Sequence, residues 1–217
     1  MQFLSKDLLS ILVRVFDGEA PYLQSFIDHH KKIGIKKIYF LTEPNKSQIC
    51  KKILSKNNIG YYDLARSEHE IPFPKLKSKY VAVIDADEYL SLDILNYIEG
   101  RSFQTLSMPW EINASLCNKN YNQINQSKIL YPRGKEIVLV KDIKKLITHK
   151  SIMRKEGKRI GLKSNKNKLP LRHYYLRGIN DMFFKSIGNR SSASSFTKII
   201  NENDPDVISL RLISTAF

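Results

Sequence analysis

The sequence predicts an α/β fold, in which a mostly parallel sheet is flanked by helices. In the first half of the chain, short apolar runs rich in branched residues alternate with segments whose apolar residues recur at helical spacing. Such alternation places the strands side by side in parallel, with helices on both faces of the sheet. Apolar residues make up 42% of the 217 residues, enough for a real core. We therefore expect one domain over 1–217.

The first strand–helix–strand unit carries the clearest pattern. Leu9–Phe16 is apolar and rich in branched residues, which predicts a buried strand. Pro21 suits the first turn of the helix that follows, and apolar residues recur at helical spacing up to Ile33. Gly34 is a suitable stop for this helix. Ile35–Leu41 is then the second strand.

Four further elements complete this half. We expect a second helix over Lys46–Lys56, a short strand over Ile59–Leu64 and a fourth strand over Lys79–Ile84. The fourth strand ends abruptly in three acidic residues among the next four. Ser91 can cap a short helix that runs through Ile98.

The second half is less regular. A polar, Asn-rich stretch over 118–128 predicts a surface loop. The segment 154–169 holds seven basic residues and one acidic residue, which predicts a mobile loop that closes over a pyrophosphate. The remaining expected elements are strands at Thr105–Trp110, Glu136–Val140 and Leu171–Arg177, and a helix from Asn180 through Ile187 that ends at Gly188.

The net charge of +15 is unevenly distributed. Residues 1–109 hold 15 Lys and Arg against 13 Asp and Glu, whereas residues 110–217 hold 21 against 8. The basic half should face something anionic: nucleic acid, a phospholipid surface or a pyrophosphate-bearing substrate. No apolar run reaches the roughly 18 residues of a membrane span. We expect a cytoplasmic protein, with peripheral contact at the inner face of the membrane compatible with the charge.

Two acidic clusters follow predicted strands, at the edge where open α/β sheets bind ligands. Asp85 and Asp87 come directly after a buried strand and can share one Mg²⁺ or Mn²⁺ ion, which prefers oxygen ligands. The alternative is a solvated turn with a helix-capping Asp. Asp17 and Glu19 follow the first strand and can bind ribose hydroxyls or a base. The alternative for Glu19 is a favourable charge at the start of the helix.

Other side chains could complete a site. His149 or His173 could be a third metal ligand or donate to a pyrophosphate, although a lone histidine is more often structural. Trp110 could stack on a sugar and Glu111 could be a catalytic base; the alternative is a core Trp beside an exposed Glu. Four basic residues could hold phosphates: Lys145, Arg172, Arg177 and Lys185. The two cysteines, Cys50 and Cys117, have no metal-type spacing.

Three stretches together resemble the glycosyltransferase family 2-like group with the GT-A (nucleotide-diphospho-sugar transferase) fold, and the related family 92 glycosyltransferases. The first is RVFDGEAPYLQSFIDHHKKIGIKKIYF at 14–40, and the second is YVAVIDADEYL at 80–90, which resembles the family's Asp-x-Asp-Glu-aromatic-Leu motif. The third is Lys145 to His149 followed by LRHYYLRGINDMFFKSIGNR at 171–190. They cover about a third of the chain, in the family's order. The chain departs from the family at 41–47, where LTEPNKS replaces the usual Asp-Asn-x-Ser-x-Asp stretch.

The resemblance implies roles for five of these residues. Asp85 would contact the nucleotide and Asp87 the metal ion, with Glu19 near the nucleotide. His173 and Lys185 would lie near the pyrophosphate or the metal ion. Residues 1–109 would then form the nucleotide-sugar-binding half, and residues 110–217 the basic half that binds the acceptor and the pyrophosphate.

We therefore expect a glycosyltransferase that uses Mn²⁺ or Mg²⁺ to move a sugar from a nucleotide-diphosphate sugar onto an acceptor hydroxyl. A glycan or glycolipid acceptor fits surface polysaccharide or lipopolysaccharide synthesis, and the resemblance suggests inversion at the anomeric carbon. One alternative is a metal-dependent nuclease or other phosphoryl-transfer enzyme. Another is a basic module that binds nucleic acid or membrane, which would leave the acidic clusters unexplained.

Overall fold

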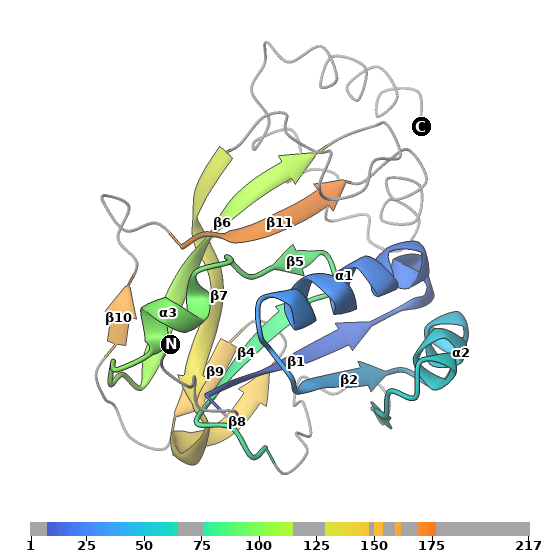
Figure 1. Cartoon of the computed structure of the whole chain (residues 1–217), viewed down its shortest axis with the longest axis horizontal. Helices are drawn as coiled ribbons and strands as arrows, with labels where there is room; N and C mark the ends of the chain where they lie inside the picture. Colours follow the sequence, from blue (N-terminus) through green and yellow to red (C-terminus); the bar gives the residue numbers. More distant parts are fainter. Residues whose placement is uncertain are drawn as a thin grey trace.

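A large mixed sheet forms the centre of the protein (Figure 1). The computed structural model describes residues 8–64, 76–114, 129–147, 150–153, 159–161 and 169–176. Within these ranges, nine strands form one sheet in the order β3-β2-β1-β4-β7-β6-β11-β5, with β10 beside β6, and β8 pairs with β9 in a separate sheet. Parallel pairings outnumber antiparallel ones in the large sheet. The predicted α/β class with a mostly parallel sheet and flanking helices is confirmed.

The elements have the following bounds. The strands are β1 Leu9–Val15, β2 Ile38–Thr42, β3 Tyr61–Asp63, β4 Tyr80–Asp85, β5 Glu88–Tyr89, β6 Thr105–Ala114, β7 Ile129–Leu139, β8 Ile143–Ile147, β9 Lys150–Met153, β10 Arg159–Gly161 and β11 Leu171–Leu176. The α-helices are α1 Ala20–Lys32, α2 Gln48–Lys56 and α3 Ile94–Ile98. Two 3-10 turns are described: Asp17–Glu19 leads from β1 into α1, and Val140–Asp142 leads from β7 into β8.

The first half follows the predicted order closely. β1 lies between β2 and β4 and is parallel to both, so both of its edges are paired, and its residues pack into a core on each face. This explains why its residues are almost all buried and why it appears in the sequence as a continuous apolar run. Gly34 follows α1 with a φ of 95°, a left-handed conformation that favours glycine and ends the helix where expected.

Residues of β1 face two separate cores. Ile11 and Val13 belong to a core that also contains residues of α1, α2 and α3, whereas Leu12 packs on the opposite face with residues that include Ile143 of β8. All three described α-helices therefore cover the same face, and Figure 1 shows α1 lying across the sheet. Within the described ranges, the expectation of helices on both faces is wrong. No helix described here has the length and apolar character to span a bilayer.

The second half departs from the prediction in several places. β6 and β7 are longer than expected, and the short strand β5 and the hairpin of β8 and β9 were not predicted. β10 pairs with β6 inside the segment 154–169, so the loop predicted there is wrong for Arg159–Gly161. The α3 helix begins at Ile94 after an N-cap at Asp93 rather than at Ser91. The loop at 118–128 and the helix from Asn180 lie outside the described residues.

Candidate functional site

Segments from three distant parts of the chain meet beside the carboxyl end of β4. β11 pairs with β5, which sets His173 opposite Glu88. It also pairs with β6, which sets Arg172 opposite Glu111. Because only Ala86 and Asp87 separate β4 from β5, the β5–β11 pairing brings the acidic turn next to His173, which the sequence singled out. Glu111 and Arg172 are one position away along their strands, so their side chains lie on the opposite face of the sheet from Trp110 and His173.

Asp87 and His173 form the centre of this site. Oδ2 of Asp87 lies 3.6 Å from Nε2 of His173, and both residues are almost completely buried. The backbone N–H of Tyr174 donates to the Asp87 carbonyl oxygen at 2.8 Å, which fixes the turn against β11. The ring of Trp110 lies against the imidazole, with 5.0 Å between the ring centroids. The structure thus brings together Asp87, Trp110 and His173, three residues that the sequence singled out, and their chemical roles stay predictions.

Glu88 is a buried residue of the acidic turn whose carboxyl hydrogen-bonds to the backbone of the turn and to Trp110. Its carboxyl is wholly buried and accepts two hydrogen bonds of 2.7 Å, one from the indole Nε1 of Trp110 and one from the backbone N–H of Asp85. Burial raises the pKa of this carboxyl well above its usual range, and the charge of Asp85 raises it further. Because it is enclosed on all sides, Glu88 shapes the turn and is not exposed to a substrate.

Lys135 is a residue that sequence reasoning missed. It lies on β7 and is 3% exposed, and its Nζ is 2.7 Å from Oδ2 of Asp85 and 3.7 Å from Oε2 of Glu88. Burial alone would lower the pKa of this ammonium, but the carboxylates of Glu88 and Asp85 outweigh burial and raise it. The acidic turn thus contains its own fixed positive charge.

A bulge in the β6–β7 pair places Lys135 and Trp110. The register shifts between Pro109 and Trp110, so that Pro109 is opposite Gly134 whereas Trp110 is opposite Tyr131. A Cβ on Gly134 would lie 1.8 Å from the backbone oxygen of Met108, so only glycine fits this close approach. The bulge therefore sets the position from which both side chains reach the acidic turn.

Glu111, the expected catalytic base, lies on β6 beside an arginine. Its Oε1 is 3.6 Å from Nε of Arg172, and its side chain is mostly buried, at 18% exposed. At this distance the two groups form an ion pair that is longer than a hydrogen bond. The base role of Glu111 stays a prediction.

Asp17 and Glu19 lie at the carboxyl end of β1 and have different surroundings. The Asp17 carboxylate accepts hydrogen bonds from the backbone N–H groups of the first three residues of α2 (Gln48, Ile49 and Cys50), at 3.0, 2.7 and 3.1 Å. It therefore caps this helix, a role that its position before α1 did not indicate. Glu19 is the N-cap residue of α1 and makes no side-chain capping hydrogen bond. Nucleotide contact by either residue stays a prediction.

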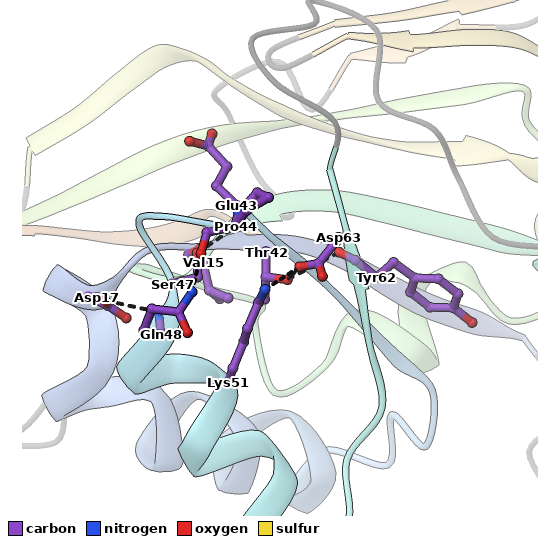
Figure 2. Close-up of polar contacts among 10 residues, drawn as sticks. All are labelled: Val15, Asp17, Thr42, Glu43, Pro44, Ser47, Gln48, Lys51, Tyr62 and Asp63. Carbon is purple, nitrogen blue, oxygen red and sulfur yellow. Dashed lines mark hydrogen bonds and ion pairs between the residues drawn. The ribbon is translucent and has the colours of Figure 1, made fainter.

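A second polar cluster lies at the carboxyl ends of β2 and β3 (Figure 2). Nζ of Lys51 is 2.5 Å from Oδ1 of Asp63, and the Thr42 hydroxyl donates to the same oxygen at 2.7 Å. These contacts lower the pKa of the Asp63 carboxyl, mainly through the Lys51 hydrogen bond. Glu43 follows β2 and pairs with Arg14 of β1. Sequence reasoning missed Lys51 and Asp63, because neither belongs to an acidic cluster.

Among the remaining predicted basic and imidazole groups, the structure describes Lys145. Lys145 lies on β8 opposite Ile152 of β9, in the separate two-stranded sheet. Three of the predicted basic or imidazole groups fall outside the described residues: His149, Arg177 and Lys185. Cys50 is buried in the core, and burial raises the pKa of its thiol to about 12, so it behaves as a packing residue.

The fit of a metal ion depends mainly on Asp87 and His173. Among the described residues, no three His, Cys, Asp or Glu side chains gather as a metal-binding group. Asp85, expected as a second carboxylate ligand, contacts Lys135 instead. One carboxylate and one imidazole still suit a cation that takes its other ligands from substrate phosphates and water, as Mg²⁺ and Mn²⁺ commonly do. The Asp87–His173 pair therefore fits such an ion.

No protein-family model and no curated protein matches the sequence. Among solved structures, this chain is similar to a 4-diphosphocytidyl-2C-methyl-D-erythritol synthase from Anaerococcus prevotii, with a TM-score of 0.42 and 12% identity over 64% of this chain and 72% of that chain. It is similar to an inositol-1-phosphate CTP transferase from T. maritima, with a TM-score of 0.38 and 12% identity over 64% and 73% of the two chains. For HddC from Yersinia pseudotuberculosis, the TM-score is 0.41 with 12% identity over 82% and 97%. Similarities this distant carry no argument about what this chain binds or does.

Proposed function

We propose that the protein is a glycosyltransferase that moves a sugar from a nucleotide-diphosphate sugar onto an acceptor hydroxyl. The observation that carries the proposal is the contact of Asp87 with His173, from two distant segments, beside the carboxyl end of β4. In an open α/β sheet this is the edge where ligands bind. The resemblance of 80–90 to the GT-A acidic motif supports the same reading.

The donor nucleotide lies, in this proposal, across the carboxyl ends of β1 to β4. The half-exposed carboxylate of Asp85, 38% accessible, accepts hydrogen bonds from the donor's ribose. Glu19 and the cluster of Lys51 and Asp63 lie at the ends of neighbouring strands. Polar groups at these strand ends suit the hydroxyls and base edge of a nucleoside.

Asp87 and His173 hold the divalent cation in this proposal. A bound Mn²⁺ or Mg²⁺ would offset the negative charge of the departing nucleoside diphosphate. His173 is kept in place by the ring of Trp110 and by the pairing of β11 with β5. Lys185 and Lys145 are the proposed additional contacts to the pyrophosphate.

Glu111 accepts the proton of the acceptor hydroxyl as that oxygen attacks the anomeric carbon. The adjacent Arg172 forms an ion pair with this carboxylate and lies 45% exposed, at the surface where an acceptor would enter. We propose a glycan or glycolipid acceptor, because the strongly basic half of the chain suits an anionic glycan or a membrane surface that presents a lipid-linked one. This places the reaction in the synthesis of a surface polysaccharide.

The test is a thermal-shift screen of UDP-, GDP-, CDP- and dTDP-linked sugars with and without Mn²⁺, followed by assays of sugar release from the donors that bind. A donor at 100 times its dissociation constant should stabilise the protein by about 2.7 kcal/mol. The proposal predicts stabilisation by one nucleotide class, enhanced by Mn²⁺, and slow release of sugar and nucleoside diphosphate. Cleavage of DNA or RNA without nucleotide-sugar binding would instead establish the phosphoryl-transfer alternative.

A further inference from the structure

We propose that Lys135 permanently occupies the cation position between Asp85 and Glu88, and so restricts divalent metal binding to Asp87 and His173. The acidic turn offers three carboxylates within four residues, at Asp85, Asp87 and Glu88. The structure assigns two of them to an internal ammonium. The part of the inference that concerns Asp87 and His173 rests on the proposed function, whereas the part that concerns Lys135 does not.

The contacts of Lys135 are those expected of a bound cation. Its Nζ lies 2.7 Å from Oδ2 of Asp85 and 3.7 Å from Oε2 of Glu88, so it faces oxygens of both carboxylates. The backbone N–H of Asp85 donates to the same Oε2 at 2.7 Å, which fixes Glu88 in this orientation. The two carboxyl groups and the ammonium therefore form a compact set, in which the ammonium offsets one of the two negative charges that the carboxyls can carry.

Burial makes this arrangement difficult to replace. The side chain of Lys135 is 2% exposed and that of Glu88 is 0% exposed. A hydrated metal ion could reach these oxygens only by displacing the ammonium, which would then be left inside the protein without its charged partners. Because that state is strongly unfavourable, Mn²⁺ cannot compete with Lys135 for this pair of carboxylates.

The backbone fixes Lys135 at this position. It follows Gly134, whose close approach to Met108 leaves no room for a side chain, and it pairs with Met108 across the β6–β7 ladder. The ammonium therefore approaches the acidic turn from a rigid strand and not from a loop. A lysine held this way acts as a positioning residue, since it is too buried to touch a substrate.

The consequence is a division of roles within the acidic turn. With one oxygen committed to Lys135, Asp85 keeps a side chain that is 38% exposed and able to accept hydrogen bonds from donor hydroxyls. Asp87, whose Oδ2 lies near His173, is left as the carboxylate that binds metal. Lys135 also reduces the negative charge that an incoming pyrophosphate meets.

Binding of Mn²⁺ without nucleotide, measured by calorimetry and by the spin resonance of free Mn²⁺, tests the proposal. K135M removes the charge while keeping most of the side-chain length, and K135R keeps the charge. We expect K135M to gain one Mn²⁺ site that the wild type lacks. Its dissociation constant for Mn²⁺ should be at least 10-fold lower than that of any wild-type site other than the one at Asp87. K135R should bind as the wild type does. In D85N/K135M the gained site should disappear.

A folded K135M with the stoichiometry and affinity of the wild type would overturn the proposal. If K135M is unfolded in metal-free buffer, its melting temperature serves as the readout. The proposal then requires Mn²⁺ to restore a folding transition, and a K135M that Mn²⁺ does not rescue contradicts it. D87N tests the metal role of Asp87 separately from the role of Lys135. If D87N loses the Mn²⁺ binding of the wild type, that result supports the proposed function and does not bear on Lys135. A wild type that binds no Mn²⁺ without nucleotide, beside a K135M that does, would support this inference, and the metal role of Asp87 is then tested with a nucleoside diphosphate present.

Discussion

Oδ2 of Asp87 lies 3.6 Å from Nε2 of His173, although one residue follows β4 and the other lies on β11 near the end of the described chain. β5 makes this contact possible, because it directly follows Asp87 and pairs with β11. The acidic turn and the histidine are thus held together by backbone pairing as well as by their side chains. Substitutions at either residue can therefore test chemistry with little change in the fold.

His173→Ala should lower the turnover of donor hydrolysis and of sugar transfer at least 10-fold, a barrier rise of about 1.4 kcal/mol or more. The reason is loss of the imidazole that, in our proposal, holds the metal ion at the pyrophosphate. Kinetics with saturating donor measure this effect, with melting temperatures to confirm folding. Lys144→Ala, at an exposed position on β8, is the matched control and should leave turnover unchanged. Near-normal turnover in a stable His173→Ala protein would remove His173 from the site.

Gly134→Ala should destabilise the protein by about 3 kcal/mol or more, because the added Cβ would lie 1.8 Å from the Met108 oxygen and the strands must move apart. Urea denaturation measures the change in the free energy of unfolding. Gly60→Ala is the control: nothing lies within 4 Å of its Cβ, and we expect a change below about 1 kcal/mol. Equal stability of the two variants would contradict the bulge that places Lys135 and Trp110.

Asp17→Ala should lower the free energy of unfolding by about 1–2 kcal/mol, because three N–H groups at the start of α2 lose their acceptor. Asp17→Asn retains a side-chain oxygen and should lose less. Denaturant titration without nucleotide tests the capping role, and nucleotide titration tests the predicted donor contact. An Asp17→Ala protein with unchanged stability and weakened nucleotide binding would show that the donor contact is its main role.

Two buried histidines should make the fold sensitive to mild acid. His30 Nδ1 lies 2.9 Å from the Phe26 carbonyl oxygen, and its Nε2 accepts from the Leu90 N–H at 3.3 Å, so the ring fits in its neutral form. Burial lowers the pKa of His30 from 6.5 to about 3, and burial also lowers the pKa of His29. Between pH 6.5 and about pH 3, His30 therefore binds a proton in the unfolded chain but not in the folded chain.

Stability should therefore be complete above about pH 6.5 and fall as the pH drops toward 3, by roughly 1.4 kcal/mol per pH unit for His30, with His29 contributing in the same direction. Urea denaturation at pH 7.5, 6 and 5 measures the slope. His30→Gln keeps one donor and one acceptor but cannot gain a proton, so its slope should be shallower by about one proton. An identical slope in His30→Gln would contradict the assignment of this pH dependence to His30.

The sequence predicted best those elements whose residues carry a local signal, such as an apolar run, a helical spacing, a proline or a glycine. The apolar run of β1, the helical spacing of α1, Pro21 and Gly34 are local signals, and the structure places these elements close to the predicted bounds. β5 and β10 have two and three residues, too few to carry a period. β5 is a strand because it pairs with β11, and β10 is a strand because it pairs with β6. Pairing between distant segments gives no periodic pattern in the sequence of either short strand.

The same distinction applies to the site. Asp85 and Asp87 were identifiable because carboxylates directly after a buried strand are unusual, and the structure sets Asp87 beside His173, whose ring contacts Trp110. Lys135 is one of 36 Lys and Arg residues and lies in the basic half, so nothing local distinguishes it. Its burial depends on the β6–β7 bulge and on contacts with β4, which only the folded sheet brings together.

The most direct test of the central claim is calorimetric titration of the wild type and Asp87→Asn with nucleoside diphosphates, each with and without Mn²⁺. Asp87→Asn keeps the size of the side chain and removes its charge. We predict that the wild type binds one class of nucleoside diphosphate at least 10-fold more tightly with Mn²⁺, a difference of about 1.4 kcal/mol or more. Asp87→Asn should lose this Mn²⁺ dependence while remaining folded. Nucleotide binding with the same Mn²⁺ dependence in both proteins, or no nucleoside diphosphate binding by the wild type, would contradict the account.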